Sequence, residues 1–78
     1  MNVLLFGITK EIVGERKLSI DVSQLTDVSS LLSFLEKEYA SFGDLKSVAV
    51  AVNEEYVAHN YILKPTDEVA IIPPVSGG

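Results

Sequence analysis

Apolar and polar positions follow two different periods along this chain. An apolar run at residues 2–8 is typical of a central strand, with Val3 and Leu5 on one of its two faces. Residues 16–22 alternate between apolar and polar, which predicts a half-exposed strand that pairs antiparallel with the first. Between them, residues 9–13 allow a helical turn but fit no single pattern.

The clearest helix is predicted over residues 27–39. Its apolar residues recur at helical spacing and form one stripe: Val28, Leu31, Leu32, Leu35 and Tyr39. Asp27, or Thr26 before it, is suited to cap the first turn. Phe34 falls beside the stripe, so we expect it at the edge of the core. A loop at Gly43 and Asp44 is expected after the helix.

The remaining chain predicts three more strands. Residues 47–53 place valines on one face and alanines on the other, residues 56–58 suit a short edge strand, and residues 68–72 form a strand that is apolar on both faces. Between the last two, Leu63 is predicted as an apolar anchor, and residues 64–67 suit a tight turn.

This order of elements predicts an α+β fold, with a mixed sheet of four or five strands and one main helix on one face. One helix covers one face of such a sheet. The opposite face carries apolar residues from the first and last strands, so we expect an apolar patch there that suits a partner protein. The domain is predicted to span residues 1–73, followed by a flexible, extended tail at residues 74–78.

The amino-acid composition excludes several kinds of site and partner for this chain. The 78 residues suffice for one small domain, and the absence of cysteine excludes disulfides and thiolate metal sites. Eleven Asp and Glu against six Lys and Arg give a net charge of −5, which argues against nucleic acid and anionic membranes as partners. The opening apolar run is too short for a signal peptide or a membrane span, so we expect a cytoplasmic protein.

Side chains suited to acid–base or metal chemistry are sparse. His59 is the single histidine and is expected in a surface loop. The acidic residues fall mostly in turns, and no pair of them suggests general acid–base catalysis. We therefore expect no metal site and no catalytic constellation within this chain.

The final six residues are Pro73, Pro74, Val75, Ser76, Gly77 and Gly78. Two prolines favour an extended course, and residues 74–78 reach roughly 17 Å when fully extended. The two glycines lack side chains, so a narrow channel in another protein could admit them. The alternative is a frayed chain end without a role.

The chain resembles the ubiquitin-like β-grasp sulfur carriers, most closely the small subunits of molybdopterin synthase, over nearly its whole length. The likeness rests on VLLFG at residues 3–7, VAVN at 50–53, TDEVA at 66–70 and IPPVSGG at 72–78. The ending PPVSGG is its most specific part, because the thiamine-pathway carriers also end in Gly-Gly but lack the Pro-Pro spacer.

This resemblance implies a sulfur donor rather than an enzyme that acts alone. An adenylyltransferase similar to ubiquitin-activating enzymes would use ATP to adenylate the carboxylate of Gly78, and sulfur would then replace AMP to leave a thiocarboxylate. The tail would enter the large catalytic subunit of molybdopterin synthase, in a heterotetramer. There it would donate sulfur to the cyclic pyranopterin precursor and form the dithiolene of molybdopterin. No tightly bound cofactor is implied.

The resemblance also implies roles for single residues. Gly78 would carry the sulfur, and Phe6 would face the large subunit. The residues expected in the partner's groove are Pro74, Val75, Ser76 and Gly77. From the residues alone, Phe6 is equally well explained as an ordinary core aromatic.

Three other functions remain open. The chain could carry sulfur for thiamine, for thiolated tRNA or for an amino-acid pathway. It could be a ubiquitin-like modifier whose Gly78 is joined to lysines by an isopeptide bond. It could also be a plain binding module whose tail has no role.

Overall fold

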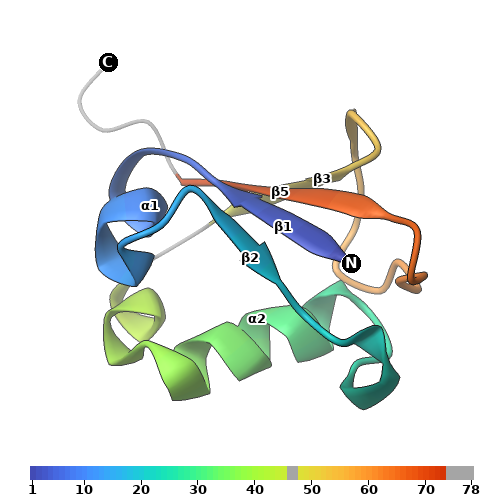
Figure 1. Ribbon diagram of the computed structural model, residues 1–78, viewed down its shortest axis with the longest axis horizontal. Coiled ribbons are helices and arrows are strands. Elements are labelled where there is room, and N and C mark those ends of the chain that lie inside the picture. Colours follow the sequence, from blue (N-terminus) through green and yellow to red (C-terminus); the bar gives the residue numbers. More distant parts are fainter. Residues whose placement is uncertain (46–47, 74–78) are drawn as a thin grey trace.

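The computed structural model describes residues 1–45 and 48–73, which form a sheet with a long helix across one face (Figure 1). The elements in chain order are β1 (Asn2–Leu5), α1 (Gly7–Val13), β2 (Lys17–Ser19), the 3₁₀ helix η1 (Val22–Gln24), α2 (Val28–Glu38), the 3₁₀ helix η2 (Ala40–Asp44), β3 (Ala49–Val52), β4 (Glu55–Tyr56) and β5 (Glu68–Ile72).

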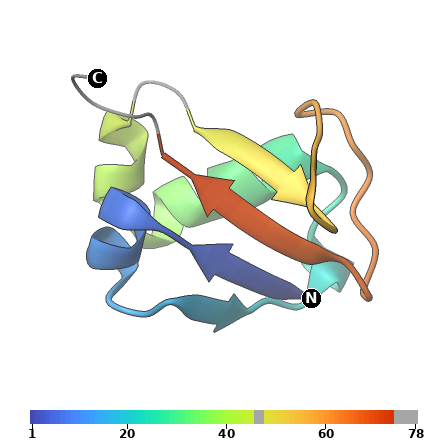
Figure 2. The ribbon, with the colours of Figure 1, turned by 90° about the horizontal axis from the view of Figure 1, so that it is seen from above.

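The sheet is mixed and has five strands in the order β2-β1-β5-β3-β4. The two central strands β1 and β5 are parallel, and the other neighbouring pairs are antiparallel. Figure 2 shows β1 between β2 and β5, with the arrowheads of β1 and β5 pointing to the same end of the sheet. This topology confirms the predicted mixed sheet and its antiparallel first pair.

The core lies between α2 and one face of the sheet. From α2, the side chains of Val28, Leu31 and Leu35 are fully buried. The sheet contributes the alternate residues of its three inner strands: Val3, Leu5, Val50, Val52, Val69 and Ile71. Truncating a buried leucine of this kind to alanine costs about 2–5 kcal/mol, so the stripe on α2 carries a large part of the fold's stability.

Helix α2 begins and ends one residue inside the predicted range 27–39, and Asp27 rather than Thr26 caps it. The Asp27 carboxylate accepts a hydrogen bond from the Ser30 amide at 2.9 Å, and the Ser30 hydroxyl donates to the Asp27 carbonyl at 2.7 Å. Phe34 is half-buried at the edge of the core, as expected.

The second half of the chain follows the prediction closely. β5 spans the predicted residues, and Leu63 is buried. The turn at residues 64–67 closes with the Asp67 amide donating to the Lys64 carbonyl at 3.0 Å. The edge strand is β4, one residue earlier and one residue shorter than predicted. β3 is shorter than the predicted 47–53, of which residue 47 lies outside the described residues.

The prediction of one strand across residues 2–8 is wrong beyond Leu5. β1 ends there, and Gly7 begins α1 with a φ of 56° that an extended strand does not have. The buried Thr9 fixes this change, because its hydroxyl donates to the Phe6 carbonyl at 2.6 Å and accepts from the Phe6 amide at 3.1 Å. The segment that fitted no single pattern is therefore a helix.

Two further segments differ from the prediction. β2 ends at Ser19, and the chain then turns into η1, whose first turn is capped by the Asp21 carboxylate accepting from the Ser23 amide at 2.9 Å. The loop predicted at Gly43 and Asp44 is the end of η2, where the buried Phe42 packs into the core. In the described residues, no helix is long and apolar enough to cross a membrane.

Candidate functional site: the exit corner of the sheet

The chain leaves the sheet at a corner formed by β1, α1 and β5. Because β1 and β5 are parallel with Leu5 opposite Ile71, Phe6 follows beside Ile72, and Gly7 follows beside Pro73. We call the four residues Phe6, Gly7, Ile72 and Pro73 the exit corner. Pro73 is the last described residue. This corner is therefore the part of the described domain that lies next to the tail in the chain.

Gly7 brings α1 and Pro73 into close contact. A Cβ atom built on Gly7 would lie 3.0 Å from Cγ of Pro73, and the residue has a positive φ that side-chain-bearing residues rarely adopt. A side chain at this position would therefore meet both a strained backbone conformation and a tight contact with Pro73. The sequence singled out Phe6 at this corner but not Gly7, although the glycine that interrupts an apolar run is a usable signal.

Phe6 lies on the surface. Its side chain is 49% exposed, whereas Phe42, which packs in the core, is 4% exposed. Phe6 takes this position because the strand has ended and Thr9 holds its backbone at the start of α1. Of the two explanations that the sequence left open, the ordinary core aromatic is wrong.

The face of the sheet opposite α2, which we call the open face, is largely apolar. Strand alternation places Leu4, Ala49, Ala51, Ala70 and Ile72 on it, with the polar residues Asn2 and Glu68 at the end away from the exit corner. At one edge of this open face, Tyr56 pairs with Ala51 and is 73% exposed; at the other edge Lys17 pairs with Leu4. The open face thus carries the apolar patch that the strand pattern predicts, and it continues into the exit corner.

Among residues 1–45 and 48–73, every buried side-chain nitrogen and oxygen atom has a hydrogen-bond partner. The buried Asp67 carboxylate accepts from the side-chain amide of Asn53 at 3.0 Å and from the Lys64 amide at 2.9 Å, which joins the turn before β5 to the end of β3. His59 is exposed, and its carbonyl accepts from the amide of Ser29 at 2.9 Å. Among residues 1–45 and 48–73, no three His, Asp or Glu side chains are grouped so as to hold a metal ion.

The pKa of the Asp21 carboxylate is shifted, and this group lies away from the exit corner. The hydrogen bond from the Ser23 backbone amide, with a second from its side chain, lowers the pKa of Asp21 below 3.8. The group is fully exposed and caps η1, so this shift reflects local capping rather than catalytic tuning.

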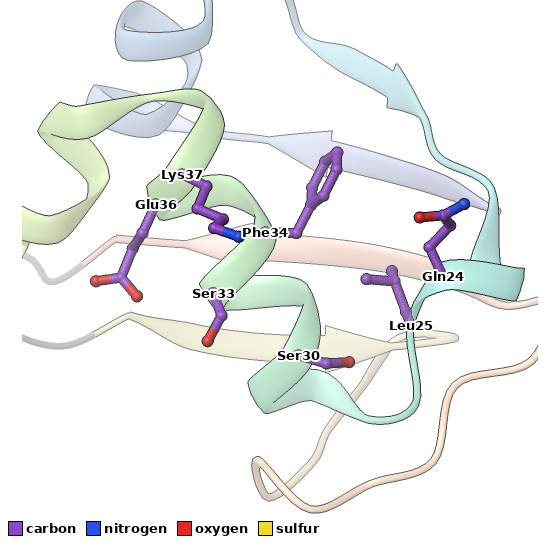
Figure 3. Close-up of a pocket in the computed structure, with 7 residues that line it drawn as sticks. All are labelled: Gln24, Leu25, Ser30, Ser33, Phe34, Glu36 and Lys37. Atoms are coloured by element: carbon purple, nitrogen blue, oxygen red, sulfur yellow. The ribbon is translucent and has the colours of Figure 1, made fainter.

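A groove of about 680 Å³ follows the outer side of α2 (Figure 3). The side chains that line it are Gln24, Leu25, Ser30, Ser33, Phe34, Glu36 and Lys37. The Ser30 hydroxyl is already used in the cap of α2, where it accepts from the Thr26 amide at 2.8 Å. The groove thus offers a mixed lining without a nucleophile–base pair or a ligand set.

The five predicted tail residues, Pro74, Val75, Ser76, Gly77 and Gly78, lie outside the described residues. Of the six predicted site residues, the described part of the chain therefore contains Phe6 alone. Phe6 lies at the exit corner, where the described residues end at Pro73. The predicted roles of all six residues stay predictions.

Comparison with known proteins gives a consistent set of similarities. A model of the ThiS family matches residues 3–78. The molybdopterin synthase sulfur carrier subunit of Arabidopsis thaliana is 35% identical over 79 residues, which cover 100% of this chain and 82% of the relative.

Two solved structures extend the similarity to the fold. SAMP1 from Haloferax volcanii matches with a TM-score of 0.82 and 28% identity, covering 100% of this chain and 98% of that chain. A chain from the complex of subunits 1 and 2 of the molybdopterin-converting factor of Helicobacter pylori matches with a TM-score of 0.67 and 27% identity, covering 99% of this chain and 96% of that chain.

These matches confirm the predicted β-grasp fold and the resemblance to the sulfur carriers. The family model spans nearly the whole chain, and it includes the tail that the sequence singled out. The chain belongs to the ThiS family.

Proposed function

We propose that this chain is the sulfur-carrier subunit of a molybdopterin synthase. The observation that carries the proposal is a similarity to a molybdopterin synthase sulfur carrier subunit that covers all of this chain, including its Gly-Gly end. The fold supports it, because β5 leads to the exit corner and the tail begins directly after it.

The proposed reaction uses Gly78 as the reacting residue. An adenylyltransferase similar to ubiquitin-activating enzymes joins the Gly78 carboxylate to AMP and releases pyrophosphate from ATP. This step is needed because a free carboxylate is a poor electrophile. A sulfur donor then displaces AMP, and the resulting thiocarboxylate needs no cysteine, in keeping with a chain that has none.

In the third step the tail enters a large catalytic subunit and gives its sulfur to the cyclic pyranopterin precursor of the dithiolene. Gly77 and Gly78 suit a narrow passage, with Pro74, Val75 and Ser76 as the segment that lies in the groove. The assembly is proposed as a heterotetramer. The large subunit supplies the acids and bases of the reaction.

Phe6 and the open face are proposed to contact the large subunit. An exposed aromatic side chain next to an apolar sheet face has the composition that protein interfaces concentrate at their centres. Support comes from the Helicobacter pylori structure, in which a similar chain is part of a complex of two subunits.

Reconstituted sulfur transfer tests this proposal. The chain is loaded with sulfur, mixed with the large subunit and the pyranopterin precursor, and assayed for the dithiolene product. We expect product from the full chain and none from a chain that lacks Gly78, with both chains showing the same thermal transition. Equal product from the shortened chain would refute the role of Gly78.

A second function is favoured by one observation. The similar protein SAMP1 is a small archaeal modifier protein, which supports attachment of Gly78 to lysines of other proteins as an alternative. A ladder of covalent conjugates in extracts of the native cell, lost when Gly78 is deleted, would support the modifier. Thiamine or tRNA pathways would instead be indicated if the large subunit fails to copurify with the chain.

A further inference from the structure

A hollow with a positively charged rim lies beside the exit corner. Its volume is about 470 Å³, and β1, α1 and β2 surround it. Its lining consists of Leu4, Leu5, Phe6, Gly7, Lys10, Arg16 and Lys17. Three of the six Lys and Arg residues of the chain thus line one hollow, in a protein whose net charge is −5. We call it the basic hollow.

The backbone holds the three cations in place. Lys17 pairs with Leu4 across β2 and β1, and the Leu5 amide donates to the Arg16 carbonyl at 2.8 Å. Lys10 comes from α1. That helix ends at Gly14, which adopts a φ of 86° and donates its amide to the Lys10 carbonyl at 2.8 Å. Lys10 therefore comes from α1 and Lys17 from β2, while Arg16 lies in the connection just before β2 and is joined to β1 by its carbonyl.

The basic hollow combines two recognition features. Its wall is apolar, with Phe6 49% exposed and Leu4 half-buried. Within residues 1–45 and 48–73, none of the three cationic side chains makes a side-chain hydrogen bond. A ligand that fits both features has an apolar side chain and carboxylates on either side of it.

We propose that the basic hollow binds an acidic segment of a partner protein, with one aliphatic side chain of that segment against Leu4 and Phe6. Charge complementarity favours this occupant, because the hollow is a local cationic site on an anionic protein. A nucleic acid is disfavoured by the net charge of −5 and by the apolar wall.

The identity of the partner rests on the proposed function. The basic hollow shares Phe6 and Gly7 with the exit corner, so a partner that receives the tail would also reach the hollow. It adds the chemistry by which a partner would orient the carrier before the tail enters. Binding of a free peptide measures that chemistry without sulfur transfer, so the two proposals fail independently.

The test is an NMR titration of the ¹⁵N-labelled chain with the peptide acetyl-Asp-Glu-Leu-Glu-Asp-amide. We expect amide shifts at Leu4, Phe6, Lys10 and Lys17. The uncharged peptide acetyl-Asn-Gln-Leu-Gln-Asn-amide should give none at the same concentration. Because exposed charges are screened by salt, raising ionic strength from about 0.01 M to about 0.15 M should weaken binding several-fold.

Paired variants locate the site. Arg16→Gln with Lys17→Gln should weaken peptide binding about four-fold, at about two-fold for each exposed ion pair lost. The matched control is Lys37→Gln with Lys64→Gln, which has the same net charge of −7, from −5 less two. Lys37 lies on α2, and Lys64 lies over the Tyr61 ring at 5.6 Å, so the control should retain the full affinity.

Three results would overturn the inference. The first is equal weakening in the two double variants, which would show that net charge rather than the hollow drives binding. The second is the same set of shifts from inorganic phosphate at equal concentration, which would mark a simple anion site. The third is no shift with the acidic peptide while the chain still accepts sulfur, which would remove the basic hollow and leave the proposed function standing.

Discussion

The three phenylalanines of this chain allow stability to be separated from partner binding. Phe6 is 49% exposed at the exit corner, Phe42 is 4% exposed in the core, and Phe34 is half-buried beside the groove on α2. The same substitution, phenylalanine to alanine, therefore removes an identical group from three different environments.

The expected losses of stability follow from burial. Phe42→Ala removes a core aromatic and should cost about 3–5 kcal/mol. Full burial of such a side chain stabilises by about 1.5–3 kcal/mol, so Phe6→Ala, with about half of its side chain covered, should cost about 1 kcal/mol. That loss corresponds to a fall in Tm of about 4–8 °C in a domain of this size.

The expected losses of affinity for the large subunit follow a different order from the losses of stability. If Phe6 is an aromatic anchor of the interface, Phe6→Ala should weaken binding to the large subunit by about 2 kcal/mol, or roughly 30-fold. Phe34→Ala should lose a similar small amount of stability and leave binding unchanged, because Phe34 lies on the opposite side of the sheet from the open face.

Urea unfolding measures the stabilities, and calorimetric titration with the large subunit measures the affinities. The reasoning is refuted if Phe6→Ala loses as much stability as Phe42→Ala, because Phe6 would then belong to the core. It is equally refuted if Phe6→Ala and Phe34→Ala bind the large subunit with the affinity of the unmodified chain.

Three further predictions concern local structure. Glu54→Gly should raise the free energy of unfolding, measured in urea, by about 0.5 kcal/mol. Asn53 and Glu54 have φ values of 52° and 72° in the turn between β3 and β4, and Gly is favoured at the second position of such a turn. A lowered urea midpoint would contradict this prediction. Asp27→Ala should cost about 1 kcal/mol by removing the cap of α2, and an unchanged urea midpoint would show that the cap contributes nothing. Because the pKa of Asp21 is lowered in the fold, its carboxylate stabilises the fold above pH 3.8, and this contribution is lost as the pH falls through the lower folded-state pKa. The Tm of Asp21→Asn should therefore fall less on acidification than that of the unmodified chain. Parallel curves of Tm against pH would contradict this prediction.

The main helix and the last strand could be predicted from the sequence because local and global signals agree there. The apolar stripe of α2 follows an acidic residue that suits an N-cap, and no Gly or Pro interrupts it. β5 is apolar on both faces because it lies at the centre of the sheet, between β1 and β3.

The segment after β1 could not be predicted in the same way. Phe6, Gly7 and Ile8 continue an apolar run, so their pattern is that of a strand. What ends the strand is one buried hydroxyl, on Thr9, bonded to the backbone of Phe6. Hydrophobic periodicity carries no information about such a bond.

The candidate site was predicted in part. The sequence singled out Phe6 and the tail, but it did not single out the basic hollow. Lys10 and Arg16 come together only when α1 forms and Gly14 turns the chain into β2. As long as residues 9–13 fitted no single pattern, these cations had no defined positions relative to each other.

Intact-mass spectrometry of the chain tests the central claim most directly. After incubation with an activating enzyme, ATP and a sulfur source, we predict the exchange of one oxygen for one sulfur, located by fragmentation at Gly78. An unchanged mass, under conditions in which a known carrier is modified, would contradict the account, as would sulfur found at any other residue.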